Sequence, residues 1–184
     1  EAGRMDLYLE TFEIPTMVPA ITGLRLRETF EQRLTQLGVR AYYQQKVLEA
    51  EALPDGGFRF LVGNQVPELR ITAQKAILAT GRFFGKGLRA DRFGIHESIF
   101  NLPVHQPNER SRWHHRDLLH PGGHPINRAG VMVDAQFRPV KKNGDVIHTN
   151  LFAVGSILAH QDWVRQKCGS GLSIATAYGA VNAV

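Results

Sequence analysis

Two short apolar runs, each ending at a glycine, limit the folds open to this chain most strongly. One run covers residues 76–79 and stops at the Thr-Gly pair 80–81, and the other covers 151–154 and stops at the Gly-Ser pair 155–156. Continuous apolar strands are buried on both faces, which is typical of parallel sheets covered by helices. We therefore predict an α/β fold with a mostly parallel sheet, whose ligand lies at the carboxyl ends of these strands.

A helix and a small antiparallel sheet are predicted before the first apolar run. Apolar residues recur at near-helical spacing over 21–37, where Thr22 is a candidate N-cap and Gly38 a candidate terminator. The segment after this helix alternates in character and contains a hairpin turn at 55–57. Short strands are predicted over residues 39–45, 46–53, 57–63 and 68–74.

An irregular stretch divides the remainder of the chain. Residues 89–130 are rich in His, Pro, Gly and Arg and show little apolar periodicity, which predicts a loop-rich insert. A strand over 130–140 and a turn at 141–144 are predicted before the second apolar run. The predicted domains are a helix with a small sheet (1–75), a Rossmann-like part (76–88 and 131–184), and the insert (89–130).

The segment "KCGSGLSIATAYGAV", residues 167–181, predicts a glycine-rich helix start. Backbone amides in the first turn of a helix lack intrahelical partners, so they can bind a phosphate or an electron-rich carbonyl. The small residues that follow allow close approach to a sheet or to a planar ring, and tight packing without a ligand is the alternative interpretation. The pattern lacks the third glycine of a dinucleotide fingerprint, because position 174 is Ile.

Composition and charge exclude several classes of protein for this chain. The 184 residues carry a formal charge of +5, but the basic residues are scattered and form no nucleic-acid-binding motif, so we predict no nucleic-acid partner. The single cysteine rules out a disulfide framework and fits a reducing compartment. No apolar run approaches the roughly 20 residues that a membrane span needs. The chain begins without Met and stops inside a helical pattern, so we expect an internal piece of a longer polypeptide, the alternative being a trimmed full-length protein.

Three segments together resemble the B subunit of the bacterial anaerobic glycerol-3-phosphate dehydrogenases. They are "IPTMVPAITGLRLRETFEQRLTQLG", "ILATGRFFGKGL" and "LFAVGSILAHQDWVRQKCGSG". The resemblance implies the C-terminal portion of a flavoprotein of the FAD/NAD(P)-binding Rossmann-like superfamily, without the N-terminal nucleotide-binding βαβ unit. It also implies FMN as the cofactor, with FAD less favoured. We expect these residues alone to be colourless and inactive.

The resemblance further implies a place in a complex with two partners. A catalytic flavin subunit oxidises sn-glycerol 3-phosphate to dihydroxyacetone phosphate, and an iron–sulfur subunit passes electrons to the quinone pool. The B subunit, a component of this quinone-linked oxidoreductase acting on CH–OH groups, relays electrons between them. The expected location is cytoplasmic, peripheral to the inner face of the cell membrane through a partner.

The resemblance also assigns a cofactor site. Thr80 and Gly81 would close the first strand under the flavin, and Gly155 and Ser156 would approach its ribityl or phosphate portion. Flavoproteins of this class favour Asp where this chain has Ser156, and Asp162 is the candidate for the missing carboxylate. The isoalloxazine carbonyl edge would meet the helix start at Gly169, Ser170, Gly171 and Leu172.

Several polar side chains remain as weaker candidates. His160 is a candidate proton donor, with an ordinary hydrogen-bonded histidine as the alternative, and His105 is expected nearby. Arg82 and Arg165 could each bind a phosphate or form a surface ion pair. We interpret Cys168 as a packing residue. The spacings of His114, His115, His120 and His124 suit zinc, but no cysteine lies nearby and the Pro-Gly-Gly loop has no preset geometry, so we predict no metal site.

Two other functions stay open at this point. One is a different flavoprotein oxidoreductase of the same fold, such as a fumarate-reductase-like enzyme. The other is a non-catalytic module in which the insert at 89–130 docks a partner and the glycine-rich ends serve only packing.

Overall fold

The computed structural model describes residues 22–184, apart from the side chains of Thr22, Trp163 and Val164. The chain divides into two units, residues 1–44 and 45–184. Residues 22–38, the described part of one of the three segments that carry the family resemblance, belong to the first unit. Residues 14–21 of that segment lie outside the described part.

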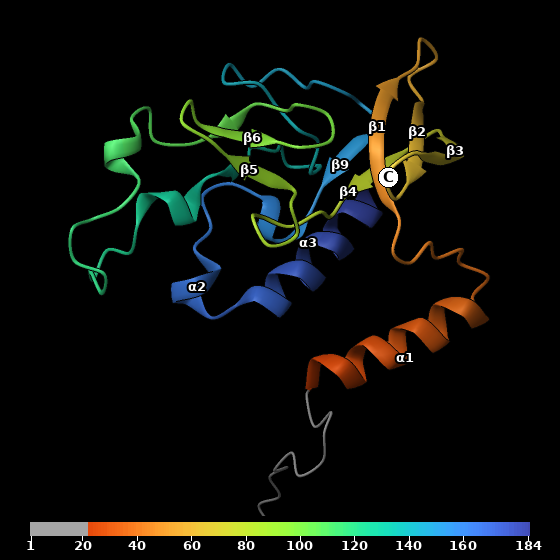
Figure 1. Cartoon of the computed structure of the whole chain (residues 1–184), viewed down its shortest axis with the longest axis horizontal. Helices are drawn as coiled ribbons and strands as arrows, with labels where there is room; N and C mark the ends of the chain where they lie inside the picture. Colours follow the sequence, from red (N-terminus) through yellow and green to blue (C-terminus); the bar gives the residue numbers. More distant parts are fainter. Residues whose placement is uncertain (1–21) are drawn as a thin grey trace, which may run out of the picture. The chain divides into compact units, whose positions relative to one another are not determined.

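The first unit contains the helix α1, Thr22–Gln36 (Figure 1). The helix ends as predicted, because Gly38 adopts a φ of 73° and its N–H donates to the Thr35 carbonyl at 3.0 Å. Thr22 is the first helical residue, and Arg27 pairs with Glu31 one turn later at 2.6 Å. The strand predicted over 39–45 is wrong, since this segment forms turns and irregular backbone with Gln44 at a φ of 59°.

The second unit begins with a three-stranded antiparallel sheet in the order β1-β2-β3. Its strands are β1 (Lys46–Ala52), β2 (Phe58–Gly63) and β3 (Pro67–Ala73), which confirms three of the predicted strands. The predicted hairpin turn is present: Leu53 N donates to Gly57 O at 2.8 Å, and Gly56 has a φ of 84°. The Asp55 carboxylate accepts a bond from Gly57 N at 3.0 Å, which fixes this turn.

The two apolar runs pair as parallel strands, β4 (Ala76–Leu78) and β9 (Leu151–Ala153), as predicted. Figure 1 shows them side by side near the C-terminal end of α3. β9 is fully buried, whereas Ile77 at the centre of β4 is 45% exposed, so burial of both faces is confirmed only for β9. Within the described residues this is the single parallel ladder between named strands, and the predicted mostly parallel sheet is therefore not seen.

The insert is more regular than predicted. It contains β6 (Ile95–Glu97) and β7 (Val104–His105), two short 3-10 helices, η1 (Arg110–Arg112) and η2 (Pro125–Arg128), and packs on β5 (Leu88–Ala90) and β8 (Gly130–Val131). Glu97, 3% exposed, organises the bend after β6, because its carboxylate accepts bonds from the backbone N–H groups of Ile99, Phe100 and Leu102 at 2.8, 2.7 and 3.2 Å. Leu88, Ile95, Leu102 and Trp113 join Leu151 in one apolar core.

The single strand predicted over 130–140 is wrong beyond β8. The Asp134 carboxylate accepts bonds from the backbone N–H groups of Gln136 and Arg138 at 3.0 and 2.9 Å and from the Arg138 side chain at 2.8 Å. These bonds close a tight turn in which Phe137 has a φ of 63°. The turn predicted at 141–144 is confirmed by the bond from Gly144 N to Lys141 O at 3.0 Å.

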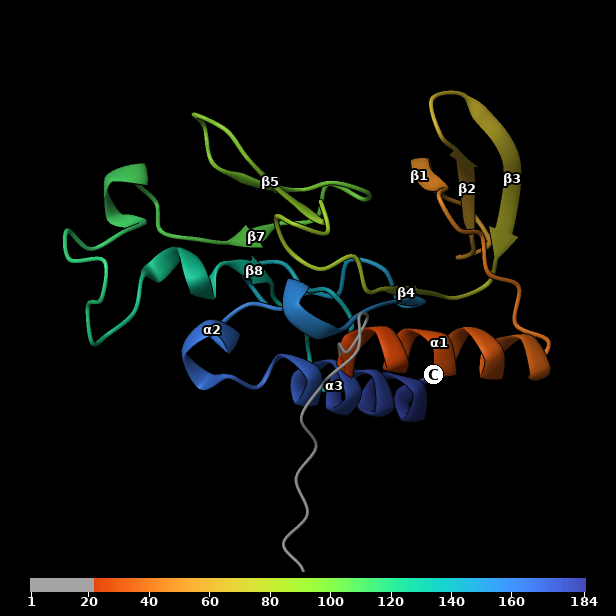
Figure 2. The ribbon, with the colours of Figure 1, turned by 60° about the horizontal axis from the view of Figure 1, so that its bottom comes forward.

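The chain closes with a 3-10 turn and two helices. These are η3 (Gly155–Ile157), α2 (Trp163–Gln166) and α3 (Gly169–Ala183), the last of which confirms the predicted glycine-rich helix. Figure 2 shows α3 at the C-terminal end of the chain, where it contacts η3. Its small residues permit this approach: Thr176 and Ala180 are buried, and Ala180 packs with Phe152, Val154 and Phe137.

Candidate functional site

The two glycine-terminated strand ends meet, as the parallel pairing predicts. Gly81 and Gly155 both adopt positive φ, 70° and 75°. A Cβ built on Gly81 would lie 3.6 Å from Ser156 Oγ, so the turn after β4 faces the turn after β9. Three of the residues predicted to contact the cofactor, Gly81, Gly155 and Ser156, therefore share one end of the parallel pair.

A threonine that the sequence analysis did not single out joins this strand end to the glycine-rich helix. The buried N–H of Gly155 donates to Thr176 Oγ1 at 2.8 Å, and the same hydroxyl donates to Leu172 O at 2.7 Å. A Cβ on Gly155 would lie 3.5 Å from Ser173 Oγ, in the first turns of α3. Thr176 therefore fixes the helix start at the carboxyl end of β9.

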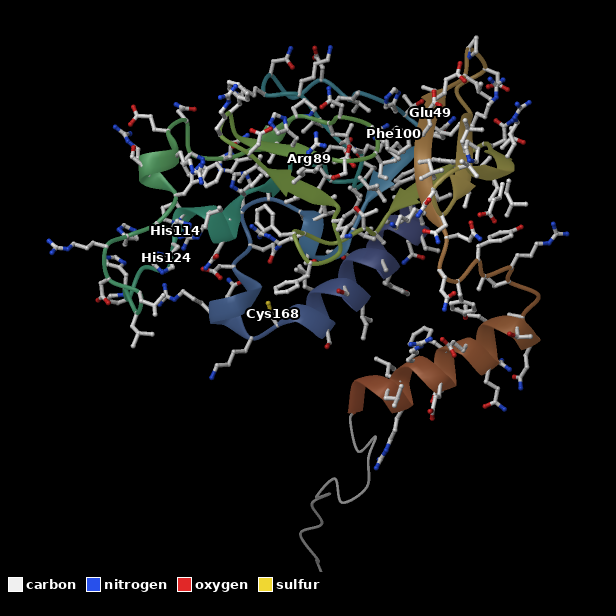
Figure 3. The ribbon with its side chains drawn as sticks, viewed as in Figure 1. Glu49, Arg89, Phe100, His114, His124 and Cys168 are labelled. Carbon is white, nitrogen blue, oxygen red and sulfur yellow. The ribbon has the colours of Figure 1, made fainter. Side chains whose placement is uncertain are left out.

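The start of α3 is open on this chain. Ser170 and Gly171 are exposed, and a Cβ added to Gly171 would meet no atom within 4 Å. Leu172 N donates to Cys168 O at 2.8 Å, so this amide already serves the helix. Figure 3 shows Cys168 at the same helix end. Ser170 and Gly171 are therefore accessible at the helix start, whereas the Leu172 amide is engaged, and the contact of this helix start with a flavin stays a prediction.

Thr80 is covered by the loop that follows it, residues 81–87. Its hydroxyl is buried with no hydrogen-bond partner in the described part of the chain, and a Cβ on Gly87 would overlap it. The residue also lines an apolar cavity of about 310 Å³ between the antiparallel sheet and β4. Its contacts are thus with the 81–87 loop and this cavity, and its contact with a cofactor stays a prediction.

Asp162 is held inside the protein. It is 4% exposed, and Oδ1 accepts a bond from Arg165 N at 3.2 Å, which caps α2. Oδ2 is buried without a hydrogen-bond partner among the described residues and faces Gly123. These contacts give Asp162 a capping role beside the insert, and the predicted contact with a flavin chain stays a prediction.

Arg82 and Arg165, the candidate phosphate ligands, have different surroundings. The Arg82 guanidinium is 9% exposed and donates to the carbonyls of Ile126 at 2.6 Å and of Asn127. Burial lowers the pKa of Arg82, and the charge of Asp162 opposes that shift. Arg82 thus anchors η2 to the loop after β4. Arg165 is exposed and packs against Gly123.

The histidines form two groups. The rings of His105 and His160 lie 4.2 Å apart, and His160 is exposed with a φ of 67°. Burial, followed by the positive charges of His160 and Lys142, lowers the pKa of His105. His160 is therefore accessible to a solute from this side, and its role as a proton donor stays a prediction.

The loop histidines, labelled at His114 and His124 in Figure 3, bind their own backbone. His124 Nδ1 accepts from His115 N at 3.1 Å, and His120 Nδ1 accepts from Gly122 N at 3.0 Å. The rings of His115 and His120 stack at 3.8 Å. No group of three or more His, Cys, Asp or Glu residues that could hold a metal occurs in the described part of the chain.

A family match assigns this chain to a class of protein. The sequence profile of the FAD binding domain family matches residues 3–172, and the chain belongs to that family. The class is that of flavin-binding proteins with a Rossmann-like fold, of which this chain carries a mixed α/β part.

The individual relatives that match this chain are more specific than the family, because they share one name. Proteins named as the B subunit of anaerobic glycerol-3-phosphate dehydrogenase are 31% identical over 176 residues in Vibrio cholerae strain M66-2, 33% over 178 in Vibrio vulnificus strain CMCP6 and 34% over 164 in Yersinia pestis strain Antiqua. The matches cover 96%, 97% and 89% of this chain, which confirms the family resemblance. The chain spans 40%, 40% and 38% of the lengths of these relatives.

Solved structures add no relative, since none matches the chain. No helix in the part that the structure describes is long and apolar enough to cross a membrane.

Proposed function

We propose that this chain is the C-terminal part of the flavin-bearing B subunit of a quinone-linked anaerobic glycerol-3-phosphate dehydrogenase. The whole complex oxidises sn-glycerol 3-phosphate to dihydroxyacetone phosphate, and this chain relays the electrons. Its partners in the proposal are a second flavin subunit, which contacts the substrate, and an iron–sulfur subunit located at the inner face of the cell membrane. The names and 31–34% identity of the relatives support this assignment.

The observation that carries the proposal is the link from Gly155 through Thr176 to the start of α3. It holds a strand-end glycine with positive φ beside a helix start whose first residues are accessible. A planar heterocycle can approach the Gly169–Gly171 backbone, because no side chain occupies the space above Gly171. The open space at Gly171 supports the placement of a flavin edge here.

The residues would act on the flavin by binding and electrostatics. A bound flavin supplies the electron-transfer chemistry. The backbone N–H groups of residues 169–171 would donate to its pyrimidine edge, where reduction adds negative charge. A helix N-terminus stabilises such a charge by about 0.3–1 kcal/mol when exposed and by up to ~2 kcal/mol when partly buried, which favours the reduced state.

FMN is the cofactor that we propose, although the matching family is described as FAD-binding. Ser156 stands where flavoproteins of this class favour a carboxylate, and Asp162 is engaged in capping α2. A site without that carboxylate is better suited to the shorter cofactor. Denaturing the intact protein and identifying the released flavin by chromatography decides between them, and a folded protein that releases no flavin would refute the proposal.

A variant at the helix start tests the site itself. Gly171→Leu should leave the fold intact, because the position is exposed and leucine favours a helix by roughly 0.5–1 kcal/mol over glycine. The added side chain would occupy the space of the flavin edge, and we expect flavin affinity to fall at least about tenfold. Ala175→Leu, also exposed on α3, is the matched control and should retain flavin. Equal flavin content in both variants would show that the helix start does not contact the flavin.

The dehydrogenase assignment needs a separate assay. Oxidation of glycerol 3-phosphate with a dye acceptor should require co-expression of the second flavin subunit. A flavin-loaded protein that supports no such oxidation with any partner would point instead to another oxidoreductase of the same fold.

A further inference from the structure

A cavity of the second unit lies beside the insert, away from the residues expected to hold the flavin. Its volume is about 540 Å³, which is within the range of small-molecule sites. It lies between the turn before β6, the segment from β7 to η1, and the chain after β8. None of the residues predicted to contact the cofactor lines it.

The charged side chains that line this cavity are all cationic. Arg92, Arg110 and Lys142 all face it, together with His105, and no Asp or Glu is among the lining residues. Within the described chain none of these three cations forms an ion pair. The cavity therefore concentrates about three unneutralised positive charges in a small volume, which favours a multiply charged anion.

The nearest acidic side chains are committed elsewhere. Asp91 accepts bonds from the backbone N–H groups of Phe93 and Gly94 at 2.7 and 3.0 Å, and its other oxygen pairs with His96 at 3.3 Å. Glu109 contacts Ser111 at 3.2 Å and Arg112 at 3.7 Å. Neither carboxylate turns into the cavity to neutralise its cations.

Aromatic rings orient the two guanidinium groups. Arg92 Cζ lies 4.6 Å from the centre of the Phe93 ring, and Arg110 Cζ lies 5.6 Å from the Trp113 ring, which is itself 6% exposed. A guanidinium stacked on a ring keeps its N–H edge free for a planar or tetrahedral oxyanion, and it loses less rotamer entropy on binding.

The backbone around the cavity is fixed as well. Gln106 accepts a bond from Ile95 N at 2.7 Å and donates to Ile95 O at 2.9 Å, which ties the segment after β7 to β6. Burial first, and then the positive charges of its neighbours, lower the pKa of His105, which agrees with a local positive potential. Two of the segments that line the cavity are therefore joined to each other by hydrogen bonds.

We infer that this cavity binds a phosphomonoester, with the phosphate held by Arg92, Arg110 and Lys142 and the organic part in the remaining volume. A phosphate dianion matches the charge, and its three terminal oxygens can accept from several donors at once. A free phosphorylated metabolite is the source that fits, because none of the residues expected to hold the flavin lines the cavity. Binding in this cavity is independent of the proposed oxidation of glycerol 3-phosphate, because it requires no turnover.

Calorimetric titration of the intact, flavin-loaded protein with inorganic phosphate and with glycerol 3-phosphate tests the inference, with glycerol as the uncharged control. We expect both phosphates, but not glycerol, to bind saturably near 0.15 M salt. Arg110→Ala should weaken that binding about tenfold, the effect of losing one charge-assisted contact. Arg116→Ala removes an equal charge from an exposed position that lines no described cavity, and should bind as the parent does.

The outcomes can support or overturn the site. Weaker phosphate binding in Arg110→Ala with normal flavin content supports a site for a free phosphomonoester, whereas loss of bound flavin in this variant would show that these cations hold the flavin and would overturn the inference. Arg110→Lys keeps the charge but loses the planar pair of N–H donors, so its phosphate affinity should lie between that of the parent and that of Arg110→Ala. Unchanged phosphate binding and flavin content in Arg110→Ala, or an equal loss in Arg116→Ala, would rule the cavity out.

Discussion

Thr176→Val removes one hydroxyl and nearly nothing else, because valine has almost the same shape as threonine. The Gly155 N–H is buried and its partner is Thr176 Oγ1, so the variant leaves this donor without an acceptor. An unsatisfied buried donor costs about 1–3 kcal/mol, and the lost donation to Leu172 O adds little because that carbonyl belongs to a helix. We therefore expect the free energy of unfolding to fall by about 1–3 kcal/mol.

Urea denaturation followed by circular dichroism measures this loss, and Thr176→Ser is the matched control. Serine keeps the hydroxyl and loses a methyl group, so its cost should stay near ~0.8 kcal/mol. In the intact protein, Thr176→Val should also weaken flavin binding, because the helix start is no longer fixed to the strand end. If the free energies of unfolding of Thr176→Val and Thr176→Ser agree within about 0.5 kcal/mol, the Thr176 hydroxyl does not connect β9 to α3 through the buried Gly155 donor.

Two further substitutions test the turns that support the insert and the last strands. Glu97→Ala should lower the free energy of unfolding by about 3–6 kcal/mol in urea denaturation, since three backbone donors lose a charged acceptor, whereas exposed Glu109→Ala should change it by less than about 0.5 kcal/mol. A loss below about 1 kcal/mol would contradict the buried geometry of Glu97. Burial raises the pKa of Asp134, but the hydrogen bonds from Arg138 and Gln136 outweigh it and the net pKa lies below 3.8. The contribution of the Asp134 carboxylate to the free energy of unfolding is therefore fully present above the pKa of the unfolded chain, and it is lost as the pH falls through the lower pKa of the folded protein. Asp134→Asn should cost about 1–2 kcal/mol at neutral pH and progressively less in acid. A cost that does not change with pH would show that the charge is unimportant.

The elements with strong local patterns were predictable from the sequence. The apolar runs at β4 and β9, the glycine-ended helix α1 and the small-residue helix α3 are all specified by side chains close in sequence. The parallel pairing of β4 with β9 followed from their continuous apolar character. Residues 39–45 alternate like a strand but find no partner, so alternation alone was insufficient there.

The errors have identifiable physical causes. The segment 130–140 has strand-forming residues, but the Asp134 side chain binds two backbone donors and an arginine, and these bonds favour a turn over an extended strand. The insert appeared irregular because its short strands are organised by the buried carboxylate of Glu97 and not by periodic apolar residues. Such side-chain bonds to backbone leave little trace in hydropathy.

Only part of the candidate site could be predicted from the sequence. The adjacency of Gly81, Gly155 and Ser156 followed from the topology, because parallel strands bring their carboxyl ends together. Thr176 was missed since a threonine among small helical residues indicates packing, and its bond to Gly155 spans 21 positions. The cations that line the insert cavity come from three separate segments, so no local motif joins them.

Close contact between Phe137 and Gly179 has an evolutionary consequence. The Phe137 ring edge occupies the volume that a Cβ at position 179 would need, with its Cζ 2.8 Å from the ideal Cβ position. Any relative with a larger residue at 179 must therefore carry a smaller one at 137 or tilt its last helix away. Paired changes at these two positions across an alignment would record this steric coupling, and a double substitution should be tolerated where the glycine change alone is not.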